Sequence, residues 1–211
     1  VVLAVDRAGL VGEDGETHHG LFDVAYLSSV PGMTLYAPSS FAEVGTMLRH
    51  ALTACDGPAA LRYPRGGEGD YHGDAGTVPT LVAREGQGIT LVTYGATYPA
   101  LLAAAERLEE AGCRPEIIKL NRLCPLDLEP VCRSVAKTGR LLVAEEVAAM
   151  GSVGERLCAG LAEAGVVPRA VRLCNTGRGF VPQGTVDQLR RLCGLDSQSL
   201  YEAAMEVWKH E

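Results

Sequence analysis

The sequence predicts an α/β protein in which mostly parallel sheets are flanked by helices, arranged as a short first unit and a larger second domain. Apolar residues make up 47% of the 211 positions and charged residues 21%, which is typical of a chain that buries a sizeable core. Aromatic residues account for only 5%, so the core must be built mainly from aliphatic side chains and alanine. Strand-like and helix-like segments alternate along the chain, which favours parallel strands joined by right-handed crossovers.

The first unit has a regular strand–helix–strand rhythm. Hydrophobic periodicity predicts, in order, a strand at 1–5, a helix at 22–29, a strand at 33–37, a helix at 40–55 and a strand at 59–63. The second helix has Ser40 and Glu43 in the spacing of a capping box. This unit is shorter than the roughly 100–150 residues of a whole domain, and the chain opens on a buried-strand pattern without Met. We therefore expect the natural start to lie upstream.

A glycine-rich segment separates the two units. Glycine recurs between Gly66 and Pro79 and interrupts all periodicity, as in loops and linkers. We expect residues 1–66 to form part of one domain, 67–80 to form a linker and 81–211 to form a second domain. An incomplete first domain would leave a sheet edge and apolar faces uncovered, which predicts poor solubility for the chain alone.

The second domain repeats the alternation of strands and helices. Periodicity predicts strands at 89–94, 115–120, 140–145 and 169–173, and helices at about 97–111, 127–137, 153–164, 184–193 and 199–209. Ser199 and Glu202 give the last helix the spacing of a capping box. No internal repeat is evident in the sequence.

Charge and cysteine content exclude several classes of function. The net charge of −7 argues against a nucleic-acid or membrane surface as the main partner, since either would favour a basic face. No apolar run approaches the length of a membrane span. The seven cysteines include no Cys-x-x-Cys pair, so neither a zinc site nor a disulfide framework is indicated. Reduced thiols fit a cytoplasmic protein.

A polar loop follows the first strand directly. Residues 6–20 contain four glycines together with Arg7, Asp14, His18 and His19. Ligands of parallel α/β sheets bind beyond the carboxyl ends of the strands, where this loop is expected to lie. A permanent cation, a carboxylate and imidazoles suit proton transfer beside a bound anion. A surface loop with solvated histidines is the alternative interpretation.

Two further segments are candidates for anion binding. Arg62 and Arg65 flank an aromatic where the third strand ends, and a guanidinium fork matches phosphate geometry. Arg65, next to Gly66, is the better candidate, while Arg62 fits a surface arginine at a domain edge. Residues 151–154 form a Gly-containing strand-to-helix turn after Glu145 and Glu146. That turn lacks a full phosphate-binding fingerprint, so tight packing is the favoured interpretation.

These residues resemble a known family, the 1-deoxy-D-xylulose-5-phosphate synthases. The matching segments are Asp6-Arg7-Ala8-Gly9, Asp14-Gly15, Thr17-His18-His19-Gly20, Arg62-Tyr63-Pro64-Arg65-Gly66 and Phe180-Val181-Pro182-Gln183-Gly184. The resemblance covers effectively the whole chain and is most specific over residues 1–66. It implies a partial pyrimidine-side thiamine-diphosphate-binding domain followed by a transketolase C-terminal-like domain.

The resemblance also implies an activity and roles for four residues. The family decarboxylates pyruvate on thiamine diphosphate and joins the two-carbon unit to D-glyceraldehyde 3-phosphate, for isoprenoid, thiamine and pyridoxal synthesis. Arg7 and Arg65 would bind the phosphate of the aldehyde. Asp14 and His18 would line the pocket, order its closed state and assist proton transfers. His19 receives no catalytic role.

The cofactor-binding residues implied by the family lie outside this sequence. The domain that binds the diphosphate and Mg²⁺ is N-terminal to the segments present here, as is the glutamate that activates the aminopyrimidine ring. No Gly-Asp-Gly segment leading to an Asn-Asn metal motif occurs in the 211 residues. The chain alone is therefore expected to be inactive and to need that N-terminal region, within an enzyme that is a homodimer.

Two alternatives stay open. One is a relative within the same superfamily, either a split transketolase C-terminal subunit or a β subunit of a 2-oxoacid dehydrogenase E1 component. The loop over residues 6–20 favours the synthase. The other is a non-catalytic assembly module that keeps the fold without the chemistry, an interpretation motivated by the absent cofactor segments. The presence of Arg7, Asp14, His18 and Arg65 argues against it.

Overall fold

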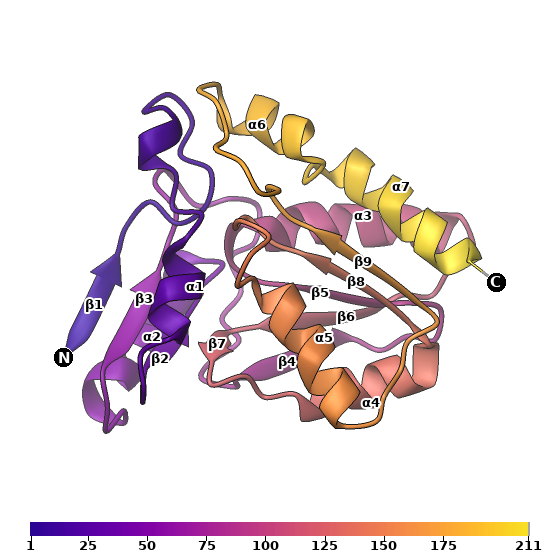
Figure 1. The fold of residues 1–211 in the computed structure, drawn as a ribbon, viewed down its shortest axis with the longest axis horizontal. Helices are drawn as coiled ribbons and strands as arrows, with labels where there is room; N and C mark the ends of the chain where they lie inside the picture. Colours follow the sequence, from indigo (N-terminus) through magenta and orange to yellow (C-terminus); the bar gives the residue numbers. More distant parts are fainter. Residues whose placement is uncertain (211) are drawn as a thin grey trace.

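Two sheets lie side by side in the computed structural model, which describes residues 1–210 (Figure 1). The first sheet has the strand order β1-β3-β2-β7. Its strands are β1 (Val2–Val5), β2 (Thr34–Tyr36), β3 (Ala59–Arg62) and β7 (Arg122–Cys124). β1 and β2 both pair in parallel with β3, whereas β7 pairs antiparallel with β2. The helices of this unit are α1 (Asp23–Ser28) and α2 (Phe41–Thr53).

The second sheet has five strands in the order β4-β6-β5-β8-β9. They are β4 (Thr80–Arg84), β5 (Thr90–Thr93), β6 (Glu116–Leu120), β8 (Arg140–Ala144) and β9 (Ala170–Cys174). β4 is antiparallel to β6 and the other pairs are parallel. The helices are α3 (Tyr98–Glu110), α4 (Glu129–Thr138), α5 (Val153–Glu163), α6 (Val186–Cys193) and α7 (Ser197–Lys209).

The helices cover the second sheet on both faces. One core cluster joins α3 and α7 to the sheet, and another joins α4 and α5 to it, in agreement with the layers seen in Figure 1. The predicted α/β class, with mostly parallel sheets between helices, is therefore confirmed. No helix within residues 1–210 is long and apolar enough to cross a membrane.

Two strands were not predicted, and both are antiparallel. β4 begins directly after the glycine-rich segment, and β7 is only three residues long. Local periodicity revealed neither strand, although β4 has five residues, as many as β6. β7 has a further consequence, because it follows β6 of the second sheet in sequence but pairs with β2 of the first. The first sheet thus contains a strand that follows β6 of the second sheet in the sequence. The two units are joined by this strand pairing as well as by the connecting segment.

Two predicted helix caps have different outcomes. The Ser40 side chain accepts a hydrogen bond from the Glu43 amide at 3.1 Å, so the predicted start of α2 is confirmed. The last helix begins earlier than predicted, because Asp196 rather than Ser199 is its N-cap. The Asp196 carboxylate accepts from the amides of Gln198 and Ser199. The carboxylate thus satisfies free N–H groups of a first turn that begins at Ser197, before the predicted cap.

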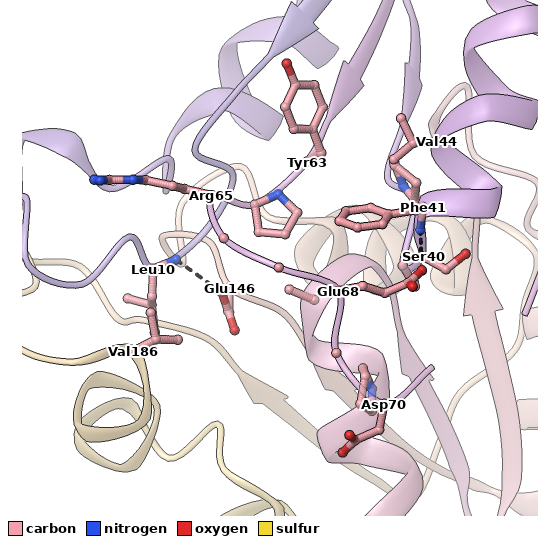
Figure 2. Close-up of a pocket in the computed structure, with 18 of the residues that line it drawn as sticks. Leu10, Ser40, Phe41, Val44, Tyr63, Arg65, Glu68, Asp70, Glu146 and Val186 are labelled. Carbon is pink, nitrogen blue, oxygen red and sulfur yellow. Dashed lines mark hydrogen bonds between the residues drawn. The ribbon is translucent and has the colours of Figure 1, made fainter. Parts of the chain in front are cut away.

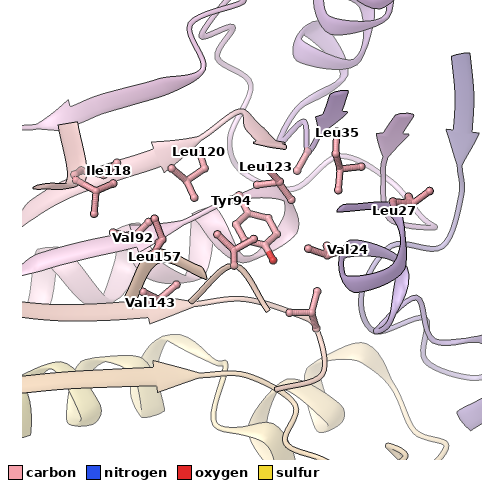
Figure 3. Packing of buried hydrophobic residues seen from close by; sticks show 14 of the residues in the cluster. Val24, Leu27, Leu35, Val92, Tyr94, Ile118, Leu120, Leu123, Val143 and Leu157 are labelled. Carbon is pink, nitrogen blue, oxygen red and sulfur yellow. The ribbon is translucent and has the colours of Figure 1, made fainter. Parts of the chain in front are cut away.

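A single apolar core connects the two units (Figure 3). Val24, Leu27 and Leu35 from the first unit belong to the same buried cluster as Leu123 of β7 and Val92 of β5. All five side chains are nearly or fully excluded from solvent. Burial of aliphatic side chains stabilises a fold by about 1.5–3 kcal/mol each, so this shared cluster fixes one sheet against the other.

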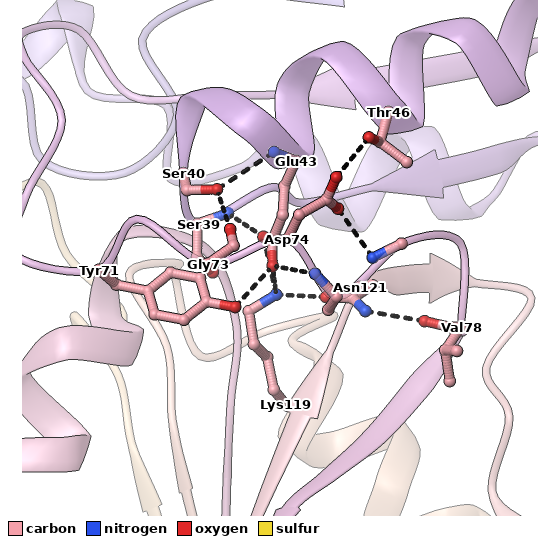
Figure 4. A network of polar contacts seen from close by, with 12 residues as sticks. Ser39, Ser40, Glu43, Thr46, Tyr71, Gly73, Asp74, Val78, Lys119 and Asn121 are labelled. Atoms are coloured by element: carbon pink, nitrogen blue, oxygen red, sulfur yellow. Dashed lines mark hydrogen bonds and ion pairs between the residues drawn. The ribbon is translucent and has the colours of Figure 1, made fainter.

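The units are also joined by a buried polar network (Figure 4). The Lys119 ammonium, on β6, donates to both carboxylate oxygens of Glu43 on α2, at 2.9 and 2.8 Å. Both side chains are fully buried. Glu43 also accepts from the Ser39 amide, the Tyr71 hydroxyl and the Ala75 amide. The glycine-rich segment is therefore held against α2 rather than hanging free.

Candidate functional site

The polar loop of residues 6–20 lies where β1 and β3 end side by side. The Ala8 amide donates to the Tyr63 carbonyl at 2.9 Å, which ties the start of the loop to the segment after β3. Gly9 and Gly20 exchange two backbone hydrogen bonds at 2.9 Å, which close the base of the loop. Arg7 has a positive φ of 64°. Residues other than glycine rarely adopt this backbone conformation, and surrounding contacts must stabilise it.

Three of the four predicted site residues are brought together. Arg7 and Arg65 come from the ends of different strands, and both donate through Nη1 to Oδ2 of Asp14. The Arg7 contact measures 3.0 Å. The Arg65 hydrogen bond lowers the pKa of Asp14, and the charge of Arg7 acts in the same direction. Asp14 in turn raises the pKa of Arg65. The cluster is open to water, with 38% of the Arg7 side chain and 52% of the Arg65 side chain exposed.

His18 lies beside this cluster without bonding to it. It ends a short 3₁₀ helix, Glu16–His18, and its side chain is exposed. Its Nδ1 lies 3.1 Å from the hydroxyl of Thr17. The positive form of His18 would lower the pKa of Asp14, although less than the arginines do. The imidazole is therefore accessible to a molecule bound next to Asp14.

His19 and Glu146 are buried side chains that hold the site loop by accepting hydrogen bonds from its backbone. His19 is only 6% exposed, and its Nδ1 accepts from the Val11 amide at 3.0 Å. Glu146, at 4% exposure, accepts from the Leu10 amide through Oε2 at 3.1 Å and from Nε of Arg190 through Oε1 at 2.7 Å. Gly9 packs directly against the Glu146 carboxylate, leaving no room there for a side chain. These contacts fix the loop on the second unit.

Arg62 is not the surface arginine that the sequence suggested. Only 4% of its side chain is exposed, and its Nε donates to the equally buried Asp23 at 2.8 Å. The guanidinium also lies 5.7 Å from the centre of the Tyr94 ring. A buried guanidinium that is paired in this way cannot also bind a substrate phosphate. The partner Asp23 is 39 positions away in the sequence, so spacing gave no signal for the pair.

The turn at 151–154 serves packing and capping, as expected. The Glu145 carboxylate accepts from the amides of Val153 and Gly154 at 3.0 and 2.8 Å and from the Tyr94 hydroxyl at 2.6 Å. The free N–H groups at the start of α5 therefore already have an anionic partner. Complete burial raises the pKa of Glu145, an effect that its three donors oppose.

A cavity of about 730 Å³ opens between the two units next to the site loop (Figure 2). Of the four predicted site residues, only Arg65 lines it. Its other walls come from the start of α2, the segment after Arg65 and the starts of α3 and α6. Side chains in these walls include Phe41, Glu68, Glu146 and Arg190. Arg65 thus links the solvent-exposed Arg7–Asp14–Arg65 cluster to the rim of this cavity.

No metal site is found in the part of the chain that the structure describes. No group of three or more His, Cys, Asp or Glu side chains within residues 1–210 could hold an ion. The cysteines among these residues are all free thiols. The charged groups that do converge are the guanidiniums of Arg7 and Arg65 and the carboxylate of Asp14. The two guanidiniums suit an oxyanion rather than a cation.

Two family models match the sequence. The model of the transketolase C-terminal domain matches residues 79–200, and that of the transketolase pyrimidine binding domain matches residues 1–67. The chain belongs to the transketolase family. Its predicted resemblance to the 1-deoxy-D-xylulose-5-phosphate synthases is confirmed by many relatives of that name.

Individual relatives show the extent of the match. A 1-deoxy-D-xylulose-5-phosphate synthase of Chlorobium luteolum is 38% identical over 216 residues, covering 99% of this chain and 34% of the relative. One of Thermomicrobium roseum is 40% identical over 205 residues, covering 95% and 32%. The chain thus spans about a third of the length of these relatives. A solved split-gene transketolase, described as an inactive beta4 tetramer, shares the fold with a TM-score of 0.85 at 24% identity, over 100% of this chain and 67% of that one.

Proposed function

We propose that this chain is the C-terminal part of a 1-deoxy-D-xylulose-5-phosphate synthase, a thiamine-diphosphate-dependent transferase. The enzyme would condense pyruvate, with loss of carbon dioxide, with D-glyceraldehyde 3-phosphate. The observation that carries the proposal is the convergence of Arg7 and Arg65 on one point at the ends of two parallel strands. The similarity to synthases of that name supports it.

Arg7 and Arg65 would bind the phosphate of the aldehyde substrate. The two guanidiniums now share a single carboxylate oxygen of Asp14, and a phosphate dianion has more charge and more acceptor oxygens than that carboxylate. Both arginines are accessible from solvent, and Arg65 also borders the 730 Å³ cavity. The phosphate would therefore replace Asp14 as the arginines' partner, leaving the rest of the substrate to extend along the cavity.

Asp14 and His18 would act next to the reacting groups. Once released from the arginines, the Asp14 carboxylate can accept a hydrogen bond from a substrate hydroxyl. The exposed imidazole of His18 can accept or donate a proton through its ring nitrogens. Together they would hold the substrate in place and move protons at its carbonyl and hydroxyl oxygens.

The cofactor would be bound mainly by regions outside this chain. Thiamine diphosphate supplies carbanion chemistry that protein side chains lack, and Mg²⁺ would hold its diphosphate. The residues described here include no suitable cluster for that metal. We therefore assign these residues to substrate binding and proton movement, and we propose that activity requires the N-terminal region in a homodimeric enzyme.

The proposal is tested by complementation. This chain would be combined with a separately expressed N-terminal half of a synthase, and the complex assayed for deoxyxylulose phosphate and carbon dioxide from the two substrates. Size-exclusion chromatography would check that the complex contains two copies of each part. Product that is lost on Arg7→Ala or His18→Ala, but kept on Arg133→Ala in the distant helix α4, supports the synthase. A folded complex without product contradicts it and favours a non-catalytic module.

Arg65 allows a sharper test in the same complex. Arg65→Ala is expected to raise the KM for glyceraldehyde 3-phosphate by about tenfold or more, because a hydrogen bond between charged groups contributes about 1.5–3 kcal/mol. The KM for pyruvate, which has no phosphate, should change by less than about twofold. Equal losses for both substrates would remove Arg65 from the phosphate-binding role.

A further inference from the structure

Two neighbouring histidines of the site loop have opposite environments. His18 is exposed, whereas His19 is buried and both of its ring nitrogens have backbone partners. Nδ1 lies 3.0 Å from the Val11 amide and Nε2 lies 3.2 Å from the Pro182 carbonyl. An amide can only donate and a carbonyl can only accept. Both contacts are hydrogen bonds only when His19 is neutral with its proton on Nε2.

The two partners of His19 belong to different parts of the molecule. Val11 lies in the site loop between Arg7 and Asp14, while Pro182 lies in the connection between β9 and α6 of the second unit. Leu10 of the loop and Val181 of the connection also belong to one small apolar cluster, together with Leu21, Ala148 and Leu189. His19 therefore adds a second directional contact between the loop and the second unit, next to this apolar cluster and apart from the hydrogen bond of the Leu10 amide to Glu146.

We propose that His19 is a positioning residue whose neutral Nε2–H tautomer fixes the site loop on the second unit, so that Arg7 and Asp14 face Arg65. It does not touch the substrate. The expected effect on phosphate binding rests on the proposed function. The contact of His19 with Val11 and Pro182 does not. Arg7 has a positive φ and lies four residues before Val11, so its strained backbone depends on how this segment is held.

The chemistry of the contact identifies the informative substitutions. In His19→Gln, the amide oxygen can accept from Val11 and the amide N–H can donate to Pro182, so both functions are kept. In His19→Phe, a ring of similar shape fills the space without an acceptor or a donor. Val135→Ala, on the buried face of α4, provides a control that lowers stability without touching either loop.

The experiment combines nuclear magnetic resonance with phosphate binding on this protein. Histidine nitrogen shifts are expected to show the Nε2–H tautomer for His19, and the Val11 amide should exchange slowly with solvent. His19→Phe should speed that exchange by about tenfold or more and weaken the binding of inorganic phosphate several-fold. His19→Gln should keep both values within about twofold of the unmodified chain. Val135→Ala should lower the melting temperature with phosphate affinity unchanged.

Several results would overturn the inference. A proton on Nδ1, fast exchange of Val11 in the unmodified protein, or His19→Gln behaving like His19→Phe would each contradict the contact. Equal loss of phosphate binding in His19→Phe and Val135→Ala would mean a general effect of stability rather than positioning. If the unmodified chain binds no phosphate, the proposed function is contradicted, whereas the tautomer and the Val11 exchange still decide the role of His19.

Discussion

Two clusters in this molecule each pair basic side chains with a carboxylate, but one cluster is buried and the other is exposed to solvent. The junction cluster joins Lys119 to Glu43 with both side chains fully buried. The site cluster joins Arg7 and Arg65 to Asp14 with all three side chains partly exposed. The carboxylate of the junction has five hydrogen bonds from protein groups, whereas the Asp14 carboxylate accepts from the two arginines.

The difference indicates what each cluster is suited to do. A buried charge that loses its partner is very unfavourable, so the junction can adopt only one arrangement. The partners of an exposed pair can be exchanged at little cost because water solvates either arrangement. The junction therefore fixes the two sheets relative to each other, and the site cluster can release Asp14 and accept a phosphate. Rigid support beneath an exchangeable site is what substrate binding requires.

The largest expected effect comes from breaking the junction. Glu43→Leu leaves the Lys119 ammonium buried with Asn121 as its remaining polar partner, and should destabilise the protein by about 3–5 kcal/mol. Lys119→Met should cost less, because Glu43 keeps the donors on Ser39, Tyr71 and Ala75. Denaturant unfolding measures both values.

The control for the junction is an exposed pair on α4. Arg133→Met breaks the Arg133–Glu129 contact, whose side chains are 63% and 70% exposed, and should change the free energy of unfolding by less than about 0.5 kcal/mol. The double variant Glu43→Leu with Lys119→Met should recover much of the stability lost in Glu43→Leu, because no unpaired charge remains. A double variant as unstable as the sum of the singles would contradict the comparison.

The sequence predicted the site cluster better than the junction. Arg7 and Asp14 are close in the sequence, and the rule that ligands bind at the carboxyl ends of parallel strands placed Arg65 near them. Lys119 and Glu43 are 76 positions apart. Lys119 lies in a mostly apolar strand, and nothing in the surrounding sequence indicates that its partner is Glu43. Its burial lowers the pKa of Lys119, and the Glu43 charge opposes that change.

The same limit explains the other errors. β7 could not be predicted because its pairing with β2 depends on a partner about 90 positions earlier and not on its own three residues. The buried Arg62–Asp23 pair and the support of the loop by Glu146 likewise join residues far apart in the sequence. Local periodicity and capping signals gave the α-helices, the strands other than β4 and β7, and the start of α2. Contacts between distant segments had to come from the structure.

A smaller effect is expected from Asp14→Asn. This change removes the negative charge that Arg7 and Arg65 share, so inorganic phosphate no longer competes with a carboxylate. Phosphate affinity should rise about two- to fivefold, the range expected for an exposed ion pair, while the melting temperature stays nearly constant. Isothermal titration measures the affinity, and Glu16→Gln on the same loop, at an exposed position in the 3₁₀ helix, is the matched control. Weaker phosphate binding in Asp14→Asn would show that Asp14 helps to build the anion site.

The smallest effect separates the two arginines of the site. The pKa of Asp14 is below its ordinary value, chiefly through its hydrogen bond with Arg65. A carboxylate with a lowered pKa stabilises the folded state at pH values above its unfolded pKa, and this contribution is lost as the pH falls through the folded pKa. In an acid titration followed by carbon resonance of the Asp14 carboxyl, Arg65→Ala should raise the midpoint more than Arg7→Ala does. If the order is reversed, Arg7 is the main partner of Asp14, and the phosphate site is centred on the strained residue at the end of β1 rather than on the rim of the cavity.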